Sequence, residues 1–260
     1  MSERLGLVIL GALAWTGHVS LFALRALREM LLPPYEPREV IRHVFEIGWR
    51  SAPLVAASGL SLGVVLSMHT RASLERFGAE AMIPAGLAVA LFRETGPLVT
   101  ALLVAGRVGA GIGAELGAMK VTEQIDALEA VAVDSFKFLA ATRILACILA
   151  LPLLTVITDF CGIVGGYVAE AAVSGMSWDL YFNRAFSLVE FRDFIPPTLK
   201  TAVFGLIIGT VGCYLGMTTT QGTEGVGRAS TRSVVLSSIL IIVVNVVLVR
   251  LIFVLFPARV

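Results

Sequence analysis

Five long apolar windows constrain the fold of this chain more than any other feature of its sequence. They occupy residues 49–68, 83–106, 138–169, 196–217 and 234–256. Each provides the roughly 20 mainly apolar residues that a helix needs to cross the hydrocarbon core of a bilayer. Because a segment in lipid must satisfy its own backbone hydrogen bonds, each window is expected to be a helix. The sequence therefore predicts an all-α integral membrane protein with five transmembrane helices.

Composition agrees with a membrane protein and excludes other classes. Hydrophobic residues make up 57% of the 260 residues and charged residues 15%, against roughly 25% charged residues in an ordinary soluble domain. The net charge of +1 and the three lysines exclude a nucleic-acid partner bound by phosphate neutralisation. Neither the three cysteines nor the three histidines have the spacing of metal ligands. We therefore expect no metal site in this chain.

The first 48 residues differ from the five windows because their apolar pattern is one-sided. Within residues 5–32, charged and apolar side chains fall on opposite faces of a helix, which is typical of an amphipathic helix in the membrane interface. The charged face carries Arg25, Arg28 and Glu29, and the apolar face carries Leu21, Phe22, Leu24 and Leu27. Residues 1–48 are therefore expected to form an N-terminal interfacial helix with its connector, and residues 49–260 a transmembrane domain.

Prolines are expected to set the end of the interfacial helix. Pro33, Pro34 and Pro37 cannot donate a backbone hydrogen bond and should end it, so that residues 36–50 form a charged connector on the membrane surface. A cleaved signal peptide is the alternative, because residues 12–14 resemble a cleavage site. The apolar pattern continues beyond that point, which favours the interfacial helix.

The distribution of lysine and arginine predicts the orientation. If the N-terminus and the segments 107–143 and 218–233 lie on one side, that side carries twelve Lys and Arg residues and the other side seven. The positive-inside rule then makes the first side cytoplasmic. Five spans place the C-terminus on the opposite, periplasmic side.

Three motif matches fail for lack of context. Residues 59–63 match a nucleophile elbow but lie inside a span, so we interpret Ser58, Gly59 and Gly63 as a contact for another helix. The glycine run at 109–114 follows a span rather than a β-strand, which excludes a dinucleotide fingerprint. The sequence also lacks the Gly-Lys pair of a Walker A loop. Any work driven by ATP would therefore need a separate subunit.

The second window contains an adjacent pair of charges. Arg93 and Glu94 lie about a third of the way along it, followed by Gly96 and Pro97. A charge at the centre of a membrane helix costs about 2.5–3.5 kcal/mol even on the lenient insertion scale, so such residues usually face a partner, a cavity or a water path. Two interpretations are open: a structural ion pair between helices, or a polar element of a substrate path.

Other polar residues lie in or beside the windows, namely Arg71, Asp159, Lys200 and Asn245. Arg71 and Lys200 either extend to the interface or turn inward with Arg93 to form a basic rim for an anionic headgroup such as phosphate. Apolar residues flank these positions and could contact acyl chains. They are Leu66, Met68, Leu87, Leu91 and Phe204.

The segment 107–137 between the second and third windows has a helical pattern. Its apolar residues Ile112, Leu116 and Met119 recur at helical spacing, and Ile125 and Leu128 resume the pattern. A break is expected at residues 121–122, where Thr122 can cap a second helix. The polar face carries Glu115, Glu123, Asp126 and Glu129. The segment is either a solvated loop or, as the break favours, a docking helix for a cytoplasmic partner.

Several ordered runs resemble a known family. These runs are residues 90–97 (ALFRETGP), 105–110 (AGRVGA), 114–119 (AELGAM), 122–128 (TEQIDAL), 151–154 (LPLL) and 227–235 (GRASTRSVV). Together they resemble the MlaE permease family of ABC transporters over nearly the whole chain after the N-terminal helix.

The resemblance implies a function, a location and partners. It implies a homodimeric permease in the bacterial inner membrane that moves phospholipids between the inner and outer membranes and maintains outer-membrane lipid asymmetry. Two cytoplasmic ATPase subunits would bind ATP and Mg²⁺, and a periplasmic ring of MCE-domain proteins would receive the lipid. The chain itself would be no enzyme and would hold no cofactor.

The resemblance also implies two groups of site residues. Segment 115–129 would be the coupling helix that docks on the ATPase. Its candidate contacts are Glu115, Met119, Lys120, Thr122, Glu123, Gln124, Asp126, Leu128 and Glu129. The lipid would bind in an outward-open cavity at the dimer axis. The candidate lipid-binding residues are Leu66, Met68, Arg71, Leu91, Arg93, Glu94, Lys200 and Asn245.

Two functions of other classes are alternatives. An ion-coupled secondary carrier of an amphipathic substrate could use Arg93 and Glu94, with Asp159 as a further ionisable group. Such carriers usually have internal repeats and paired broken helices, and this sequence has one Gly-Pro interruption without a second. An intramembrane enzyme would need a catalytic set, and Ser61 has no evident partner.

Overall fold

The computed structural model describes residues 2–33, 35–220 and 222–255, and these ranges contain helices and turns but no strand. Within them, five helical segments are long and apolar enough to cross a membrane. They are Pro37–Phe77, Glu80–Val121, Phe136–Ser174, Phe191–Met217 and Gly222–Leu255. The all-α class and the five expected spans are therefore confirmed, and the chain has the features of a multi-pass membrane protein.

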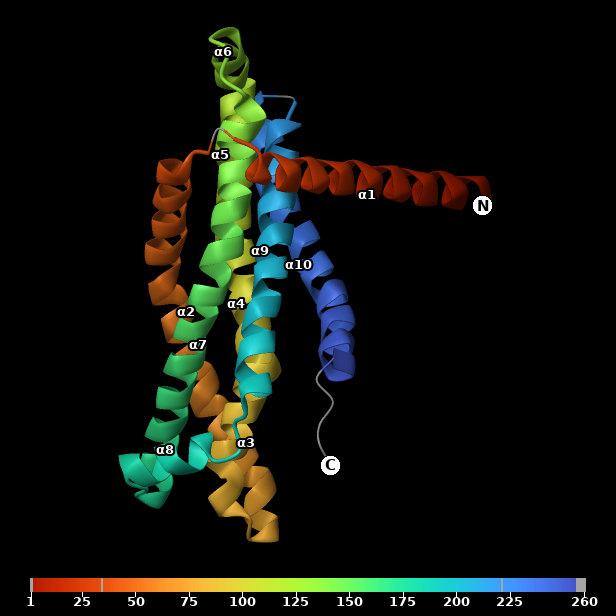
Figure 1. Cartoon of the computed structure of the whole chain (residues 1–260). Helices are drawn as coiled ribbons and strands as arrows, with labels where there is room; N and C mark the ends of the chain where they lie inside the picture. The colour runs from red at the N-terminus through yellow and green to blue at the C-terminus, as the bar shows by residue number, and fades with distance from the viewer. Residues whose placement is uncertain (1, 34, 221, 256–260) are drawn as a thin grey trace. The chain divides into compact units, whose positions relative to one another are not determined.

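Figure 1 follows the helices along the chain from red at α1 to blue at α10. The α-helices are α1 (Ser2–Leu31), α2 (Pro37–Leu74), α3 (Ile83–Ala90), α4 (Gly96–Val104), α5 (Ala110–Val121), α6 (Gln124–Ala130), α7 (Thr142–Ser174), α8 (Trp178–Phe186), α9 (Phe191–Met217) and α10 (Gly222–Leu255). Short 3₁₀ turns η1 (Glu75–Phe77) and η2 (Glu80–Met82) precede α3. Two π-helical stretches, η3 (Leu91–Thr95) and η4 (Ala105–Gly109), interrupt the second span, and a third, η5 (Phe136–Ala141), begins the third span.

Two expected loops prove to be helical. The expectation of a charged connector at residues 36–50 was wrong, because α2 begins at Pro37. Proline suits the first turn of a helix, where its missing N–H has no partner to lose and its fixed φ is already helical. The segment 218–233 is likewise mostly helix, because α10 begins at Gly222. A hydropathy window covers only the apolar part of a helix, whereas the backbone hydrogen bonds of the helix continue into the polar residues on either side of that part.

The ends of the expected elements fall partly outside the described residues. Helix α1 ends at Leu31, before Pro33, as expected. Pro34 and Phe256, the last residue of the expected fifth window, lie outside the described residues, as do Met1, Gln221 and residues 257–260.

The chain forms two compact units, each built from three segments. The first contains Met1–Val44, Ala105–Cys147 and Leu206–Ser237, and the second contains Phe45–Val104, Ile148–Gly205 and Ser238–Val260. Both units take residues from the expected transmembrane domain, because the long helices contribute one part to each.

In the first unit, α1 packs against η5 through aromatic contacts. The ring of Phe22 meets Phe136 edge-on at 4.8 Å and Tyr214 at 5.6 Å, and the Arg25 guanidinium lies 4.2 Å from the centre of the Phe136 ring. Leu21 and Leu24 stay exposed. This helix therefore uses part of its apolar surface for the protein and leaves another part uncovered.

In the second unit, α2 and α7 approach closely through small residues. A Cβ added to Gly59 would overlap the Thr158 carbonyl oxygen, and one added to Gly63 would overlap the backbone of Gly162. Because neither glycine has a side chain, the two backbones can pack in contact. The predicted helix contact at Gly59 and Gly63 is confirmed.

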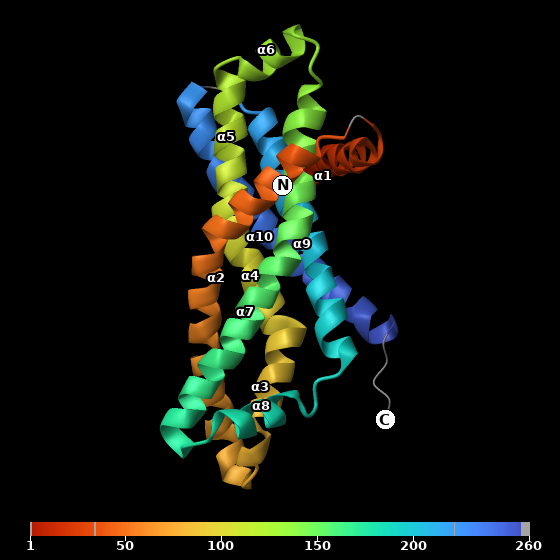
Figure 2. The ribbon, with the colours of Figure 1, turned by 60° about the vertical axis from the view of Figure 1, so that its left-hand side comes forward.

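The core of the second unit lies between α3, α7 and α8. Leu87, Leu91, Ile163 and Tyr181 are fully or almost fully buried there, and α8 lies beside α3 in both views (Figures 1 and 2). Burial raises the pKa of the Tyr181 phenol. The ring therefore serves as an uncharged core residue.

Candidate functional site

The second unit contains a π-helical stretch at the predicted pair of charges. Over Leu91–Thr95 the backbone widens, and Gly96 donates its N–H to the carbonyl of Leu91, five residues earlier. The Thr95 hydroxyl donates to the Ala90 carbonyl at 3.2 Å. Pro97 has no N–H, which favours such a rearrangement beside it. The interruption expected from Gly96 and Pro97 is thus a π-helix, a feature often found at functional sites.

Arg93 and Glu94 form ion pairs with residues of α9. The Arg93 guanidinium lies 2.7 Å (Nη2) and 2.8 Å (Nε) from Oδ1 of Asp193. The Glu94 carboxylate accepts hydrogen bonds from Lys200 Nζ at 3.0 Å and from Asn245 Nδ2 at 3.3 Å. The charges therefore join η3 to α9, and Glu94 also joins it to α10.

The α9 partners of these charges are buried. Lys200 is 4% exposed and donates a further hydrogen bond to the Arg93 carbonyl at 3.0 Å. Asp193 is 2% exposed and accepts the Glu190 backbone N–H at 3.0 Å. A buried charge is tolerated when it is paired and hydrogen-bonded, and both residues meet that condition.

A cavity of about 120 Å³ opens beside these pairs. Its polar wall comes from η3 and the start of α9, and its apolar wall comes mainly from α10. The lining residues are Arg93, Glu94, Arg192, Asp193, Pro197, Val249, Ile252 and Phe253. The Arg93 side chain keeps 39% exposure although it is paired. The cavity therefore has one wall that carries two arginines and two carboxylates and another that is apolar.

The other predicted lipid-binding residues lie elsewhere in the second unit. Arg71 pairs with Glu170, which also accepts a hydrogen bond from Ser67 at 2.8 Å. Leu91 is fully buried in the core, Leu66 packs against the same core, and Met68 is exposed. The structure thus brings Arg93, Glu94, Lys200 and Asn245 together, while Arg71 has its own acidic partner.

In the first unit, α5 and α6 form the predicted pair of helices. The break falls at Thr122 and Glu123, and Glu123 adopts a left-handed backbone with φ of 59°. The Thr122 hydroxyl donates to the Ala118 carbonyl at 2.9 Å. The expectation that Thr122 caps the second helix was therefore wrong, because this bond closes the last turn of α5.

Several predicted coupling residues have partners within the first unit. Lys120 pairs with Asp126 at 2.7 Å across the break, Glu115 pairs with Arg143 at 2.7 Å, and Ser135 donates to Glu129 at 2.5 Å. Of these contacts, the pair of Lys120 with Asp126 links α5 to α6, and the other two link each helix to the segment that follows. Glu123, Gln124 and Asp126 are exposed, Met119 and Leu128 are half-buried, and Ile125 is buried.

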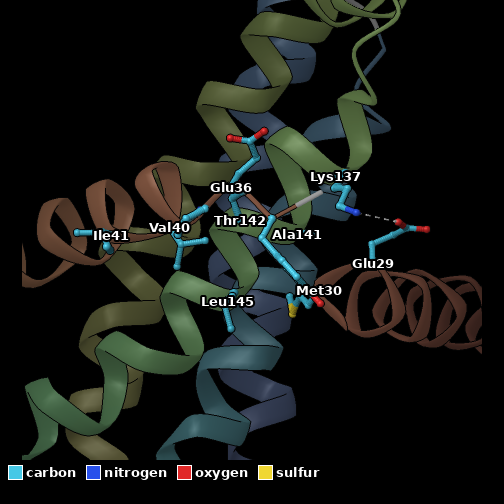
Figure 3. Close-up of a pocket in the computed structure, with 11 residues that line it drawn as sticks. Glu29, Met30, Glu36, Val40, Ile41, Lys137, Ala141, Thr142 and Leu145 are labelled. Atoms are coloured by element: carbon cyan, nitrogen blue, oxygen red, sulfur yellow. Dashed lines mark ion pairs between the residues drawn. The ribbon is translucent and has the colours of Figure 1, made fainter. Parts of the chain in front are cut away.

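The first unit has a cavity of its own, about 330 Å³ in volume, beside the connector between α1 and α2 (Figure 3). Lys137 points toward Glu29, with 3.8 Å between Nζ and Oε2, and donates to the Leu32 carbonyl at 2.6 Å. The rest of the lining is largely apolar. Sequence reasoning did not identify this cavity, because its walls come from three separate segments.

Sequence comparison relates this chain to known proteins. A sequence model described as Permease MlaE matches residues 40–251. The chain belongs to the MlaE permease family. It is 39% identical to a probable ABC transporter permease protein of Rickettsia bellii, over 91% of this chain and 92% of that protein. A probable ABC transporter permease protein of Synechocystis is 34% identical over 83% of this chain and 82% of the relative. The intermembrane phospholipid transport system permease protein MlaE of Haemophilus influenzae is 31% identical over 82% of each chain.

Two buried acids of this MlaE permease were missed by the sequence reasoning. Asp193 and Glu170 hold Arg93 and Arg71 respectively. The signal that could have revealed them is their position at the edge of an apolar window, because Glu170 directly follows the third window and Asp193 precedes the fourth by three residues. In this member of the MlaE permease family, the polar residues within the spans are thus largely paired with one another.

Proposed function

We propose that this chain is the membrane permease subunit of an ABC transporter that moves phospholipids between the inner and outer membranes and so maintains outer-membrane lipid asymmetry. The family assignment and the name of the Haemophilus relative, an intermembrane phospholipid transport system permease protein, support this proposal. In this view the chain catalyses no reaction of its own.

One observation carries the proposal: the cavity beside Arg93 joins a charged wall to an apolar wall. A phospholipid has the same division between its anionic phosphate and its acyl chains. Arg93 and Arg192 can attract the phosphate, while Val249, Ile252 and Phe253 can contact a chain. The ion pairs of Glu94 with Lys200 and of Arg93 with Asp193 would hold the charged wall in position.

The transporter would take its energy from a separate subunit. We propose that α5 and α6 are the coupling element, with the exposed Glu123, Gln124 and Asp126 docking on a cytoplasmic ATPase that binds ATP and Mg²⁺. The ion pair between Lys120 and Asp126 supports this role, because it links the two helices across the break, and linked helices transmit a movement that a flexible loop would absorb. ATP binding would shift the permease between states only through contacts that differ between those states.

The assembly would be a homodimer in the bacterial inner membrane, with a periplasmic ring of MCE-domain proteins. The N-terminus would be cytoplasmic and the C-terminus periplasmic, as the distribution of basic residues favours. Helix α1 would lie in the cytoplasmic interface, and the exposure of Leu21 and Leu24 supports contact with lipid. No cofactor would bind to this chain.

The test is to purify the tagged chain in mild detergent, identify the proteins that accompany it and analyse the bound lipids by mass spectrometry. A stoichiometric ATPase and an MCE-domain protein, with phospholipid enriched over the detergent background, are expected. The variant Glu94→Ala should retain these partners and lose lipid transfer in reconstituted vesicles. A chain without either partner would refute the proposal and favour an ion-coupled carrier.

A further inference from the structure

The second unit contains another cavity, distinct from the one beside Arg93, with a volume of about 400 Å³. Its walls come from η3, α7, α8 and the start of α9. Phenylalanines dominate the lining, at positions 92, 160, 182, 186, 191 and 194, and two carboxylic acids, Asp159 and Glu190, complete it together with three aliphatic residues. The function proposed above uses neither these phenylalanines nor the acids Asp159 and Glu190.

The aromatic rings form a connected wall. The centres of Phe92 and Phe194 are 5.3 Å apart, and their planes are almost perpendicular. Phe186 lies 6.1 Å from Phe92 and 5.7 Å from Phe182. On the other side of Phe182, the ring of Trp178 packs at 4.3 Å. Rings in such mutual contact are held in place and present fixed surfaces to the cavity.

Asp159 is a buried acid that lines the same cavity. It is 1% exposed, and neither of its carboxyl oxygens has a hydrogen-bond partner among the described residues. A Cβ added to Gly96 would overlap Oδ1, so the carboxyl group lies directly against the π-helix. A buried carboxyl group without a partner is costly, and a bound cation nearby would remove much of that cost.

Glu190 supplies an accessible acid to the same cavity. Its side chain is 61% exposed, and its carboxylate lies 2.9 Å from Nε of Arg192. The residue belongs to the short turn that joins α8 to α9, between the third and fourth membrane-spanning segments. A cavity next to such a turn is near the level at which lipid headgroups begin.

Aromatic surfaces combined with carboxylates are the chemistry that recognises organic ammonium ions, because the ring faces and the acids both carry negative potential. An acyl chain would fill the aromatic space but would leave Asp159 buried against hydrocarbon. None of the residues that line this cavity is basic, so an anionic headgroup would find no counter-charge there.

We propose that this aromatic cavity is an ammonium-binding site, which takes the amine-bearing headgroup of a lipid such as phosphatidylethanolamine or phosphatidylcholine. The shared chemistry is the substituted ammonium, which a free amine also carries. The site does not depend on the cavity beside Arg93 or on the transport function, and it would exist even if this chain moved another molecule.

The test uses the purified chain with its accompanying proteins. In the lipid arm, the protein is placed in nanodiscs of equimolar phosphatidylethanolamine and phosphatidylglycerol, extracted in detergent, and its retained lipids are quantified by mass spectrometry. In the free-amine arm, tetramethylammonium is titrated and followed by saturation-transfer NMR. The wild-type chain should retain the amine-bearing lipid about fivefold over phosphatidylglycerol, a selectivity typical of a cation at aromatic faces.

Three variants change the site. Glu190→Gln and Phe182→Leu alter the mouth and the wall, and Asp159→Asn removes the buried acid. Each should lower the preference at least about threefold. Asp179→Asn on the exposed side of α8 removes one carboxylate outside the cavity and is the matched control. Because Glu190 is exposed, its variant is expected to fold even if Asp159→Asn does not.

The outcomes separate the alternatives. One outcome is that the chain binds tetramethylammonium, that Glu190→Gln weakens this binding, and that neither lipid is preferred. This outcome supports the ammonium site with a free amine as its ligand. If the chain retains both lipids equally and does not bind tetramethylammonium, the proposal is overturned. If, in that case, Phe182→Leu alone loses all lipids, the cavity binds acyl chains. None of these results depends on recovery of an ATPase, so the proposed function is tested separately.

Discussion

Arg93 and Glu94 are adjacent in the sequence, yet each is paired with a different residue of α9. Arg93 contacts Asp193, and Glu94 contacts Lys200, seven positions further along the same helix. Neighbouring residues in a helix point in different directions and do not face each other. The two charges therefore act as separate links between η3 and α9. Of the two interpretations of this pair, the ion pairs between helices are observed, and a cavity beside them leaves room for the other.

The link between Glu94 and Lys200 should be measurable as a coupling energy. Glu94→Gln leaves the buried ammonium of Lys200 without its counter-charge and should destabilise the protein by about 1–2 kcal/mol. Removing one partner of a fully buried pair costs about 3–5 kcal/mol. The expected cost is smaller here because the Glu94 side chain is 44% exposed. The double variant Glu94→Gln/Lys200→Met should be more stable than the sum of the single effects. Thermal unfolding in detergent at a fixed scan rate checks this, and strict additivity would contradict the pairing.

Gly63 should be intolerant of even one methyl group. Gly63→Ala would force the α2 and α7 backbones apart, because its Cβ would overlap Gly162 and lie 2.8 Å from the Gly166 nitrogen. A loss of about 1–3 kcal/mol is expected from such overpacking. Gly48→Ala in the same helix is the control, since no atom lies within 4 Å of its added Cβ. That change should be neutral or stabilising by up to about 1 kcal/mol. Equal thermal stability of the two variants would show that this helix contact is looser than described.

Charge reversal on α6 should separate the permease from its ATPase. Glu123→Lys/Asp126→Lys replaces two exposed acids by bases and also breaks the pair with Lys120. Like charges placed against a complementary surface oppose docking strongly, so the ATPase recovered with the tagged chain should fall at least about tenfold. Glu224→Lys, whose side chain is 79% exposed on α10, is the control. Full recovery of the ATPase with the double variant would exclude α6 as the docking element.

Lys137 should hold the connector between α1 and α2 in place. Lys137→Met keeps the aliphatic part of the side chain but removes the bond to the Leu32 carbonyl and the pair with Glu29. Because a hydrogen bond to a charged group contributes about 1.5–3 kcal/mol, local opening should become at least about tenfold more frequent. Chymotrypsin cleavage after the exposed Tyr35 measures it. Lys120→Met serves as the control for loss of a lysine, and equal cleavage rates in both variants would argue against the anchor.

Sequence reasoning succeeded where the relevant property is local. The lengths of the five apolar windows led to five spans, and the small residues Gly59 and Gly63 led to a helix contact. The helix break between α5 and α6 was placed correctly, but its cause was not. The Thr122 hydroxyl donates to the Ala118 carbonyl of α5 and does not cap α6. A threonine at a helix break can form either kind of hydrogen bond.

It failed where hydropathy was used to set the ends of helices. Charged residues after Pro37 suggested a surface connector, although glutamate and arginine are good helix formers and the backbone continues as α2. The basic rim of Arg71, Arg93 and Lys200, one of the two alternatives for these residues, is not present as one group. Each of these residues instead has an acidic partner, Glu170, Asp193 and Glu94 respectively.

The sequence by itself determined the class of the protein and the number of its spans, because the thickness of a bilayer sets a length that each apolar segment meets independently of the others. Only the tertiary structure decided which acidic and basic side chains form ion pairs. An ion pair forms between side chains a hundred residues apart, as for Arg93 and Asp193, when packing brings their helices together at matching heights. The cavity of phenylalanines around Asp159 has the same origin, since its walls come from segments that no local pattern connects.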